Sequence, residues 1–257
     1  MHRYDVIVIG GGPAGFAAAM SARNIYPGKT IALIRKESAA LIPCGIPYTM
    51  HRLDSVEDNI LPDAPLEKAH VTIIVDRVVG RDGKTLRMAS DKDIAFDRLV
   101  VATGSRSIIP SIPGSEKAGV FTVKKEIDAL HEFKNAVTDS SSVVIVGGGC
   151  VGVEFADEIL KVGKQVAIVD QLPHLLPFSL DVEFSGFIEA AIQDQGGKLE
   201  PGTSIARIEG RDRVETVLLN DGRRLPCDLV IVAVGFKPLT WCTARPGSQL
   251  QLGDRRR

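Results

Sequence analysis

The sequence lacks an excess of charge of either sign, because its 257 residues carry 31 basic and 32 acidic side chains. This near balance gives no reason to expect a nucleic-acid partner or an anionic membrane partner. No apolar run is long enough to span a bilayer, and a strand predicted at residues 4–9 leaves no room for a signal peptide. These absences lead us to expect a cytoplasmic protein. Since 44% of the residues are hydrophobic, we also expect a sizeable core.

Cysteine is scarce, and its spacing excludes two common uses. The four cysteines, at positions 44, 150, 227 and 242, show neither disulfide-framework nor zinc-site spacing. We therefore expect reduced thiols and no metal site. Cys44 lies between two prolines, and Pro47 stands where a Cys-x-x-Cys pair would place its second cysteine. Taken alone, Cys44 is best interpreted as a small buried residue. The motifs around it instead favour a redox role for this cysteine.

A first nucleotide-type motif follows the strand predicted at residues 4–9, in which residues 5–9 form a continuous apolar run. Gly10, Gly12 and Gly15 form a Gly-x-Gly-x-x-Gly pattern, and a helix is predicted at residues 14–25 before a second strand. In such a loop the first glycine makes a tight turn, the second lets the backbone approach a pyrophosphate, and the third lets the helix pack closely. The phosphates would then meet free N–H groups at the positive end of the helix.

The end of the second strand departs from this pattern. An acidic residue normally ends that strand and binds the ribose hydroxyls. Here Arg35 has that place, and Glu37 is the nearest acid. Either Glu37 reaches the ribose or Arg35 changes the contact, while a solvated strand-end charge is the alternative interpretation of Glu37.

A second nucleotide-type motif begins after a strand predicted at residues 143–146. Gly147, Gly149 and Gly152 repeat the pattern, a helix follows, and Asp170 ends the next strand. A carboxylate there accepts hydrogen bonds from a ribose 2′-hydroxyl and repels a 2′-phosphate, which favours NADH over NADPH.

The chain thus contains an internal repeat of two βαβ nucleotide folds. One glycine loop is a weak signal, but two in the same strand–loop–helix context are a much stronger one. The predicted fold is α/β, with two Rossmann-like dinucleotide-binding domains of the three-layer type and small β-hairpin or meander insertions. Residues 1–112 would form the first domain, residues 113–238 the second, and residues 239–257 an irregular tail.

Four segments together resemble the pyridine nucleotide-disulfide oxidoreductase family over roughly residues 4–238. They are Val8-Ile9-Gly10-Gly11-Gly12-Pro13-Ala14-Gly15; Val101-Ala102-Thr103-Gly104; Val144-Ile145-Val146-Gly147-Gly148-Gly149 with Gly152 and Glu154; and Val234-Gly235-Phe236-Lys237-Pro238. This combination is specific for the family. The resemblance of the chain to this family implies a flavoprotein oxidoreductase that uses FAD and a nicotinamide dinucleotide.

The stretch Cys44-Gly45-Ile46-Pro47-Tyr48 resembles the single-cysteine branch of that family. This branch includes coenzyme A-disulfide reductases, NADH oxidases, and persulfide or sulfur reductases. The two-cysteine motif of lipoamide and glutathione reductases is missing, which argues against those activities. Peroxidases of the branch carry a histidine where this chain has Pro13, which argues against a peroxidase.

The resemblance also implies roles for individual residues. Cys44 would be the redox residue, as a mixed disulfide, a persulfide or a sulfenate. Arg23 matches a contact to coenzyme A phosphates, although a solvated helix arginine is an equally good interpretation. The FAD contacts would be Gly10, Gly12, Pro13, Ala14, Gly15, Thr103 and Gly104, with Val78 near the adenine and Glu37 as the ribose candidate; the NADH contacts would be Gly147, Gly149, Gly152, Glu154, Asp170 and Gly235.

The sequence departs from the family after Pro238. Family members continue with a segment that returns to the FAD domain and carries an Ala-x-Gly-Asp motif, followed by a dimerisation domain. The chain shows neither, so we expect an incomplete FAD domain and weak or no activity for this chain alone. A truncation or a frameshift would explain the short C-terminus.

Three hypotheses follow. In the first, a flavin-dependent NADH oxidoreductase uses Cys44 to reduce a disulfide, a persulfide or oxygen. In the second, the chain is a nucleotide-binding remnant or subunit that binds FAD or NADH without turnover. In the third, Cys44 is structural, and electrons pass from NADH to a protein partner.

Overall fold

The computed structural model describes residues 2–240, and the chain folds into two compact units that interleave along the sequence. The first unit is built from residues 2–42, 60–106 and 238–240. The second is built from Pro43–Asn59 and Ser107–Lys237. The stretch around Cys44 therefore belongs to the second unit, although it lies between two parts of the first in sequence. We call Pro43–Asn59 the cysteine segment.

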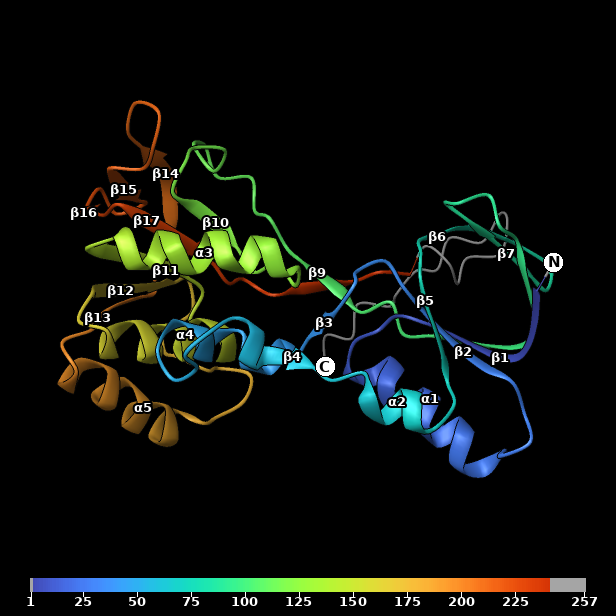
Figure 1. Cartoon of the computed structure of the whole chain (residues 1–257). Coiled ribbons are helices and arrows are strands. Elements are labelled where there is room, and N and C mark those ends of the chain that lie inside the picture. The colour runs from blue at the N-terminus through green and yellow to red at the C-terminus, as the bar shows by residue number, and fades with distance from the viewer. Residues whose placement is uncertain (1, 241–257) are drawn as a thin grey trace. The chain divides into compact units, whose positions relative to one another are not determined.

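The first unit is organised around a six-stranded sheet with the order β5-β2-β1-β8-β7-β6 (Figure 1). Four strands are parallel: β5 (Thr72–Val75), β2 (Ile31–Arg35), β1 (His2–Ile9) and β8 (Ile94–Val101). The hairpin of β6 (Val78–Asp82) and β7 (Thr85–Met88) extends the sheet in antiparallel fashion. The helices α1 (Pro13–Ile25) and α2 (Ala64–Lys68) complete the unit.

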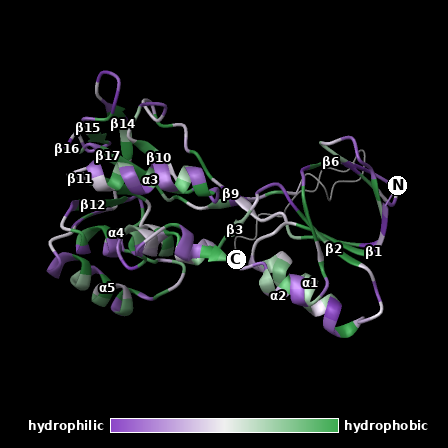
Figure 2. Cartoon of the chain, viewed as in Figure 1, coloured by the Kyte–Doolittle hydropathy of each residue, from purple (hydrophilic) through white to green (hydrophobic). Residues whose placement is uncertain are grey.

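Both faces of this sheet are buried, as expected for parallel strands with continuous apolar sequence. On one face Val8 and Leu33 pack with Ala19 of α1 and Leu66 of α2. On the other face Ile7 and Ile34 pack with residues of β6, β7 and β8. β1 and β2 are mainly hydrophobic in Figure 2, whereas the helices mix hydrophilic and hydrophobic residues.

The second unit contains a five-stranded parallel sheet with the order β10-β17-β11-β12-β13. The strands are β10 (Val120–Thr122), β17 (Leu229–Val232), β11 (Ser142–Val146), β12 (Gln165–Asp170) and β13 (Lys198–Pro201). One face packs against an antiparallel meander of β14 (Ile205–Glu209), β15 (Thr216–Leu219) and β16 (Arg224–Pro226). The helices are α3 (Ile127–Asp139), α4 (Cys150–Lys161) and α5 (Val182–Asp194).

The cysteine segment consists of three short 3₁₀ turns, η1 (Pro43–Gly45), η2 (Pro47–Met50) and η3 (Glu57–Asn59). Its turn η2 packs against α4 and α3. Two further sheets have two strands each: β3 (Ala40–Leu41) pairs with β4 (Ile60–Leu61), and β9 (Ser105–Ser107) pairs with β18 (Phe236–Pro238).

The long predicted elements are found, with shifted ends. The helix expected at residues 14–25 is α1, which begins at Pro13 and ends at Ile25, and the strand expected at residues 143–146 is β11, which begins at Ser142. The small insertions expected from the sequence are the β6–β7 hairpin of the first unit and the β14–β15–β16 meander of the second. Most of the tail predicted at residues 239–257 lies outside the described residues.

Candidate dinucleotide-binding sites

The first glycine of each loop makes the tight turn that its motif predicts. Gly10 has φ +117°, and a Cβ there would lie 2.0 Å from the carbonyl oxygen of Ala102. Gly147 has φ +111°, and its Cβ would lie 2.6 Å from the carbonyl oxygen of Ala233. A side chain at either position would be strained and would collide with the neighbouring parallel strand end.

The other two motif glycines separate into a packing position and an open position. A Cβ on Gly15 would lie 1.8 Å from the carbonyl oxygen of Gly10, so this glycine allows α1 to pack on the loop. Gly152 stands in the same relation to Gly147, at 1.9 Å. A Cβ on Gly12 would meet nothing within 4 Å.

Gly149 is open in the same way, and Gly12 and Gly149 are the N-caps of α1 and α4. Each loop therefore leaves open space beside a helix N-terminus, which is the arrangement that cradles a pyrophosphate. Pro13 and Ala14 form the first turn of α1. The residues present fit two dinucleotides, one at each loop.

The strand-end residues differ between the units. In the second unit the carboxylate of Asp170 accepts hydrogen bonds from the N–H groups of Gly148 at 2.5 Å and Leu172 at 2.8 Å. This fixes an acid beside the middle glycine of the loop. Asp170 lies at the strand end where the motif places a ribose-binding acid, and the ribose contact stays a prediction.

In the first unit the same place is filled by the side chain of Arg35, which is 4% exposed. Its terminal nitrogens donate to the two carboxylate oxygens of Asp63, both at 2.6 Å. Glu37, the predicted ribose contact, is half-buried and lies 2.9 Å from the ammonium of Lys36. The role of Glu37 stays a prediction. Asp63 was not singled out from the sequence, and nothing in its local pattern marks it.

The ends of β8 and β17 supply the remaining predicted loop contacts. Thr103 donates a hydrogen bond from Oγ1 to the carbonyl oxygen of Leu239 at 2.5 Å, and the N–H of Leu239 donates to the carbonyl of Gly104 at 2.9 Å. The returning chain is thus fixed at the carboxyl end of β8. Gly235 lies beyond β17 with φ +112°. Val78, the predicted adenine neighbour, is buried in the core of the first unit.

Two glutamates on α4 have different environments. Glu154, predicted near the nicotinamide, is half-buried, and burial raises its carboxyl pKa above the usual value. Glu158 was not predicted, and its side chain is only 1% exposed. It accepts hydrogen bonds from the N–H of Arg52 at 3.1 Å and from the ammonium of Lys161 at 3.3 Å. Buried carboxylates need such partners, so Glu158 fixes the cysteine segment to α4.

Cys44 is exposed, in contrast to its neighbours. Ile46, Pro47 and Thr49 of the same segment are buried, and a Cβ on Gly45 would lie 1.8 Å from Oδ1 of Asn59. The expectation drawn from Cys44 alone, a small buried residue, is therefore wrong. The segment buries Ile46, Pro47 and Thr49 in the second unit and leaves the thiol accessible.

The other described thiols differ in accessibility. Cys150 is exposed at the start of α4, with its Sγ 3.7 Å from Oγ of Ser179. Cys227 is buried, and burial raises its thiol pKa to about 12. No disulfide joins the described cysteines, and Cys242 lies outside the described residues. No group of three or more His, Cys, Asp or Glu within residues 2–240 is arranged to hold a metal ion.

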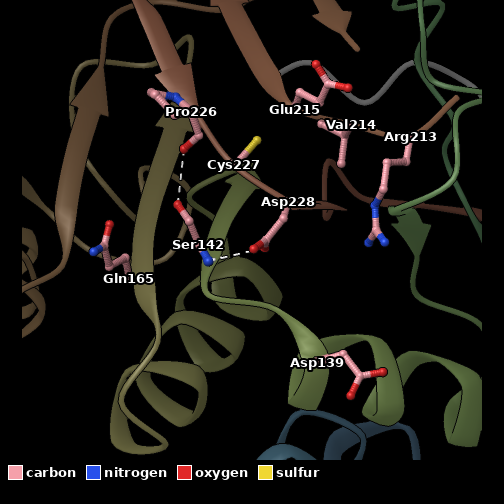
Figure 3. Close-up of a pocket in the computed structure, with 9 residues that line it drawn as sticks. All are labelled: Asp139, Ser142, Gln165, Arg213, Val214, Glu215, Pro226, Cys227 and Asp228. Atoms are coloured by element: carbon pink, nitrogen blue, oxygen red, sulfur yellow. Dashed lines mark hydrogen bonds between the residues drawn. The ribbon is translucent and has the colours of Figure 1, made fainter. Parts of the chain in front are cut away.

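A cavity of about 580 Å³ lies near Cys227, at the start of β11 (Figure 3). The glycine loop follows the other end of β11, so this cavity is not the nucleotide site. Two of its polar lining residues, Ser142 and Asp228, are held in the network that follows. The carboxylate of Asp228 accepts from the N–H groups of Ser141 and Ser142, and the hydroxyl of Ser142 donates to the carbonyl of Pro226.

The guanidinium of Arg23, the predicted coenzyme A contact, donates hydrogen bonds to the protein's own backbone. Its terminal nitrogens donate to the carbonyl oxygens of Pro27, Lys29 and His70, each at 2.8 Å. It is neither a solvated helix arginine nor an open phosphate ligand in this conformation. The coenzyme A contact stays a prediction that would require these bonds to break.

The family model described as pyridine nucleotide-disulphide oxidoreductase matches residues 4–255, and the chain belongs to this family. A probable ferredoxin reductase of Castellaniella defragrans is 31% identical over 249 residues, covering 94% of this chain and 61% of that protein. A CoA-dependent NAD(P)H sulfur oxidoreductase of Pyrococcus abyssi is 34% identical over 244 residues, covering 91% of this chain and 54% of that protein.

Among solved structures, the ferredoxin reductase for the CYP199A2 system of Rhodopseudomonas palustris matches with a TM-score of 0.85 at 29% identity. The match covers 92% of this chain and 60% of that one. The chain therefore spans little more than half the length of these relatives. The family and the α/β class with two Rossmann-like folds are confirmed, and the assignment supports FAD and a nicotinamide dinucleotide as cofactors. No helix within residues 2–240 combines the length and apolar character needed to cross a membrane.

Proposed function

We propose that the chain is the dinucleotide-binding part of an FAD-dependent NADH oxidoreductase that uses Cys44 as its redox residue. The observation that carries this proposal is the duplicated glycine cradle: each unit has a turn glycine, a packing glycine and an open glycine at a helix N-terminus. The loop at Gly10 would hold FAD, and the loop at Gly147 would hold NADH. Gly104 and Gly235 would line the two sites.

Asp170 supports NADH as the preferred donor. Its carboxylate lies beside the loop, where it would accept the ribose 2′-hydroxyl and repel a 2′-phosphate. Glu154, half-buried on the same helix as Gly152, would contact the nicotinamide end. Bound FAD would supply the chemistry that links a two-electron hydride donor to a thiol.

Cys44 would carry the sulfur chemistry. Its thiolate would attack one sulfur of an acceptor disulfide, break the S–S bond and release one thiolate, which takes up a proton. The mixed disulfide on Cys44 would then be cleaved by two electrons and would release the second thiol. In sum, NADH, one proton and one disulfide give NAD⁺ and two thiols. A persulfide would be attacked by the same accessible sulfur. With oxygen as acceptor, two electrons from NADH and two protons would give hydrogen peroxide, whose O–O bond the Cys44 thiolate would break to form a sulfenate and water; two further electrons and protons would return the thiolate and release a second water.

The test is Cys44→Ser, with Cys242→Ser as the matched control. We expect Cys44→Ser to abolish NADH-dependent reduction of disulfide and persulfide acceptors while NADH still bleaches the bound flavin. The control should retain acceptor reduction. Unchanged acceptor reduction in Cys44→Ser would exclude the cysteine mechanism.

A protein acceptor is the second candidate, favoured by the similarity to two ferredoxin reductases. In that case Cys44 is structural, and Cys44→Ser would reduce a ferredoxin as fast as the unmodified chain. A remnant that binds nucleotides without turnover is the third. It predicts FAD or NADH binding but no acceptor reduction, and flavin binding that improves when a separately expressed C-terminal half of a relative is added.

A further inference from the structure

The two nucleotide units differ at one equivalent position, and the difference leaves the first unit without an acid at the end of β2. Asp170 ends β12 and contacts the middle glycine of its loop, Gly148. Arg35 ends β2, and its side chain contacts the middle glycine of the other loop: a Cβ on Gly11 would lie 2.6 Å from Cδ of Arg35. Arginine has no acceptor for a ribose hydroxyl.

Arg35 brings an acid to this place from a distant part of the sequence. Its stem lies on Gly11, and its planar fork holds the carboxylate of Asp63 with two hydrogen bonds of 2.6 Å. Such a two-pronged pair fixes orientation as well as distance. The side chain of Arg35 therefore links the carboxylate of Asp63 to the glycine loop.

The geometry of Asp63 leaves its carboxylate available. Asp63 is the N-cap of α2, the position where an aspartate usually bonds the helix backbone, yet its side chain makes no capping bond. Its side chain is 32% exposed, whereas that of Arg35 is 4% exposed. Each carboxylate oxygen has a lone pair beyond the one used by Arg35.

We propose that Asp63, held by Arg35, is the residue that accepts the adenosine ribose hydroxyls of the dinucleotide at the first glycine loop. This inference rests on the proposed function, in which that dinucleotide is FAD. The pair replaces the strand-end acid: Arg35 is the positioning residue, and Asp63 is the ligand contact.

The same pair excludes a phosphorylated ribose. A free arginine at the strand end accommodates a 2′-phosphate, but both terminal nitrogens of Arg35 are engaged by Asp63, and one of them also bonds the carbonyl of Ser38. The carboxylate would repel a second negative charge. Nε of Arg35 is buried without a partner among the described residues.

The test is a titration of the purified chain with FAD, followed by quenching of flavin fluorescence. It uses Asp63→Asn, the competing candidate Glu37→Gln, and Glu67→Gln as a control that removes one charge from the exposed side of α2. Each is also titrated with an FAD analogue that lacks the 2′-hydroxyl of the adenosine ribose. Thermal unfolding of each variant shows whether it is folded.

We expect the unmodified chain to bind the analogue roughly tenfold more weakly than FAD, because a hydrogen bond to a charged group is lost. Asp63→Asn should lose at least as much affinity for FAD and should discriminate far less between FAD and the analogue. Glu67→Gln should behave as the unmodified chain. If Asp63→Asn does not fold, the affinities of the unmodified chain and of Glu37→Gln for FAD and for the analogue decide between Asp63 and Glu37. Discrimination that is present in both proteins supports Asp63.

Equal binding of FAD and the analogue by the unmodified chain would overturn the inference, and so would unchanged discrimination in Asp63→Asn. Loss of discrimination in Glu37→Gln would overturn it in favour of Glu37. In these cases FAD still binds, so the proposed function stands. A chain that takes up no FAD at all would instead overturn the proposed function, together with the inference that rests on it.

Discussion

Replacing Gly12 by alanine should separate ligand binding from folding in the first glycine loop. Gly12 has φ −71° and ψ −179°, which alanine adopts without strain, and its Cβ would meet no protein atom within 4 Å. The added methyl group would instead occupy the open space that backbone and pyrophosphate need for their close approach. We therefore expect a folded protein that has lost much of its affinity for FAD.

The expected energies follow from the position. As an N-cap, alanine costs about 0.5–1 kcal/mol more than glycine, and the loss of backbone freedom in the unfolded chain returns about 0.4–1 kcal/mol. The net change in unfolding free energy is about 1 kcal/mol or less. Gly10→Ala provides the contrast. Its φ of +117° and the 2.0 Å approach to Ala102 together cost about 2–6 kcal/mol of stability.

The assay combines urea unfolding with FAD titration of both variants. Gly12→Ala should unfold near the midpoint of the unmodified chain and bind FAD at least roughly tenfold more weakly, which is about 1.4 kcal/mol. Gly10→Ala should unfold at clearly lower urea. Tight FAD binding by Gly12→Ala would refute the assignment of this loop as a pyrophosphate cradle. A stable Gly10→Ala would refute the structural argument for the turn.

Three further predictions concern the donor site, the thiols and acid stability. Asp170→Ser should lower the preference for NADH over NADPH by roughly tenfold in kcat/KM, and an unchanged ratio would show that another group sets it. A thiol reagent at pH 8 should label Cys44 rapidly and leave Cys227 unlabelled in the folded chain, since burial raises the pKa of Cys227 to about 12; peptide mapping that finds Cys227 labelled first would contradict this. Hydrogen bonds from Lys29 and Thr30 hold the pKa of Asp5 well below its usual range, so this carboxylate stabilises the fold above a pH of about 4 and the stabilisation is lost as the pH falls towards the lowered pKa. Asp5→Asn should therefore unfold earlier than the unmodified chain at pH 7, with a difference that shrinks in acid, and a difference that grows in acid would contradict the assignment.

The glycine loops could be predicted from the sequence because their constraints are local. A positive φ at Gly10 and the close packing at Gly15 leave glycine as the residue that fits. The same holds for Asp170, which lies at a fixed distance along the chain from its loop. Long apolar strands such as β1 and β12 were found for a related reason, because each carries a continuous buried run.

Contacts between distant parts of the chain could not be predicted. Arg35 and Asp63 are 28 residues apart, and Glu158 bonds the backbone of Arg52 from 106 residues away. No periodicity marks either contact, so the sequence showed the missing acid at the end of β2 but not its replacement. Strands of three residues, such as β9 and β10, are too short to show an alternating pattern.

The measurement that tests the central claim most directly is the visible absorption spectrum of the FAD-loaded chain under anaerobic conditions. We expect NADH to bleach the flavin band and a small disulfide to restore it, both at the low rates expected of this chain alone. In Cys44→Ser the band should bleach with NADH but should not return when the disulfide is added. Restoration at the same rate in Cys44→Ser would contradict the role of Cys44. A chain that takes up no FAD, or whose flavin NADH does not bleach, would contradict the account of the two nucleotide sites.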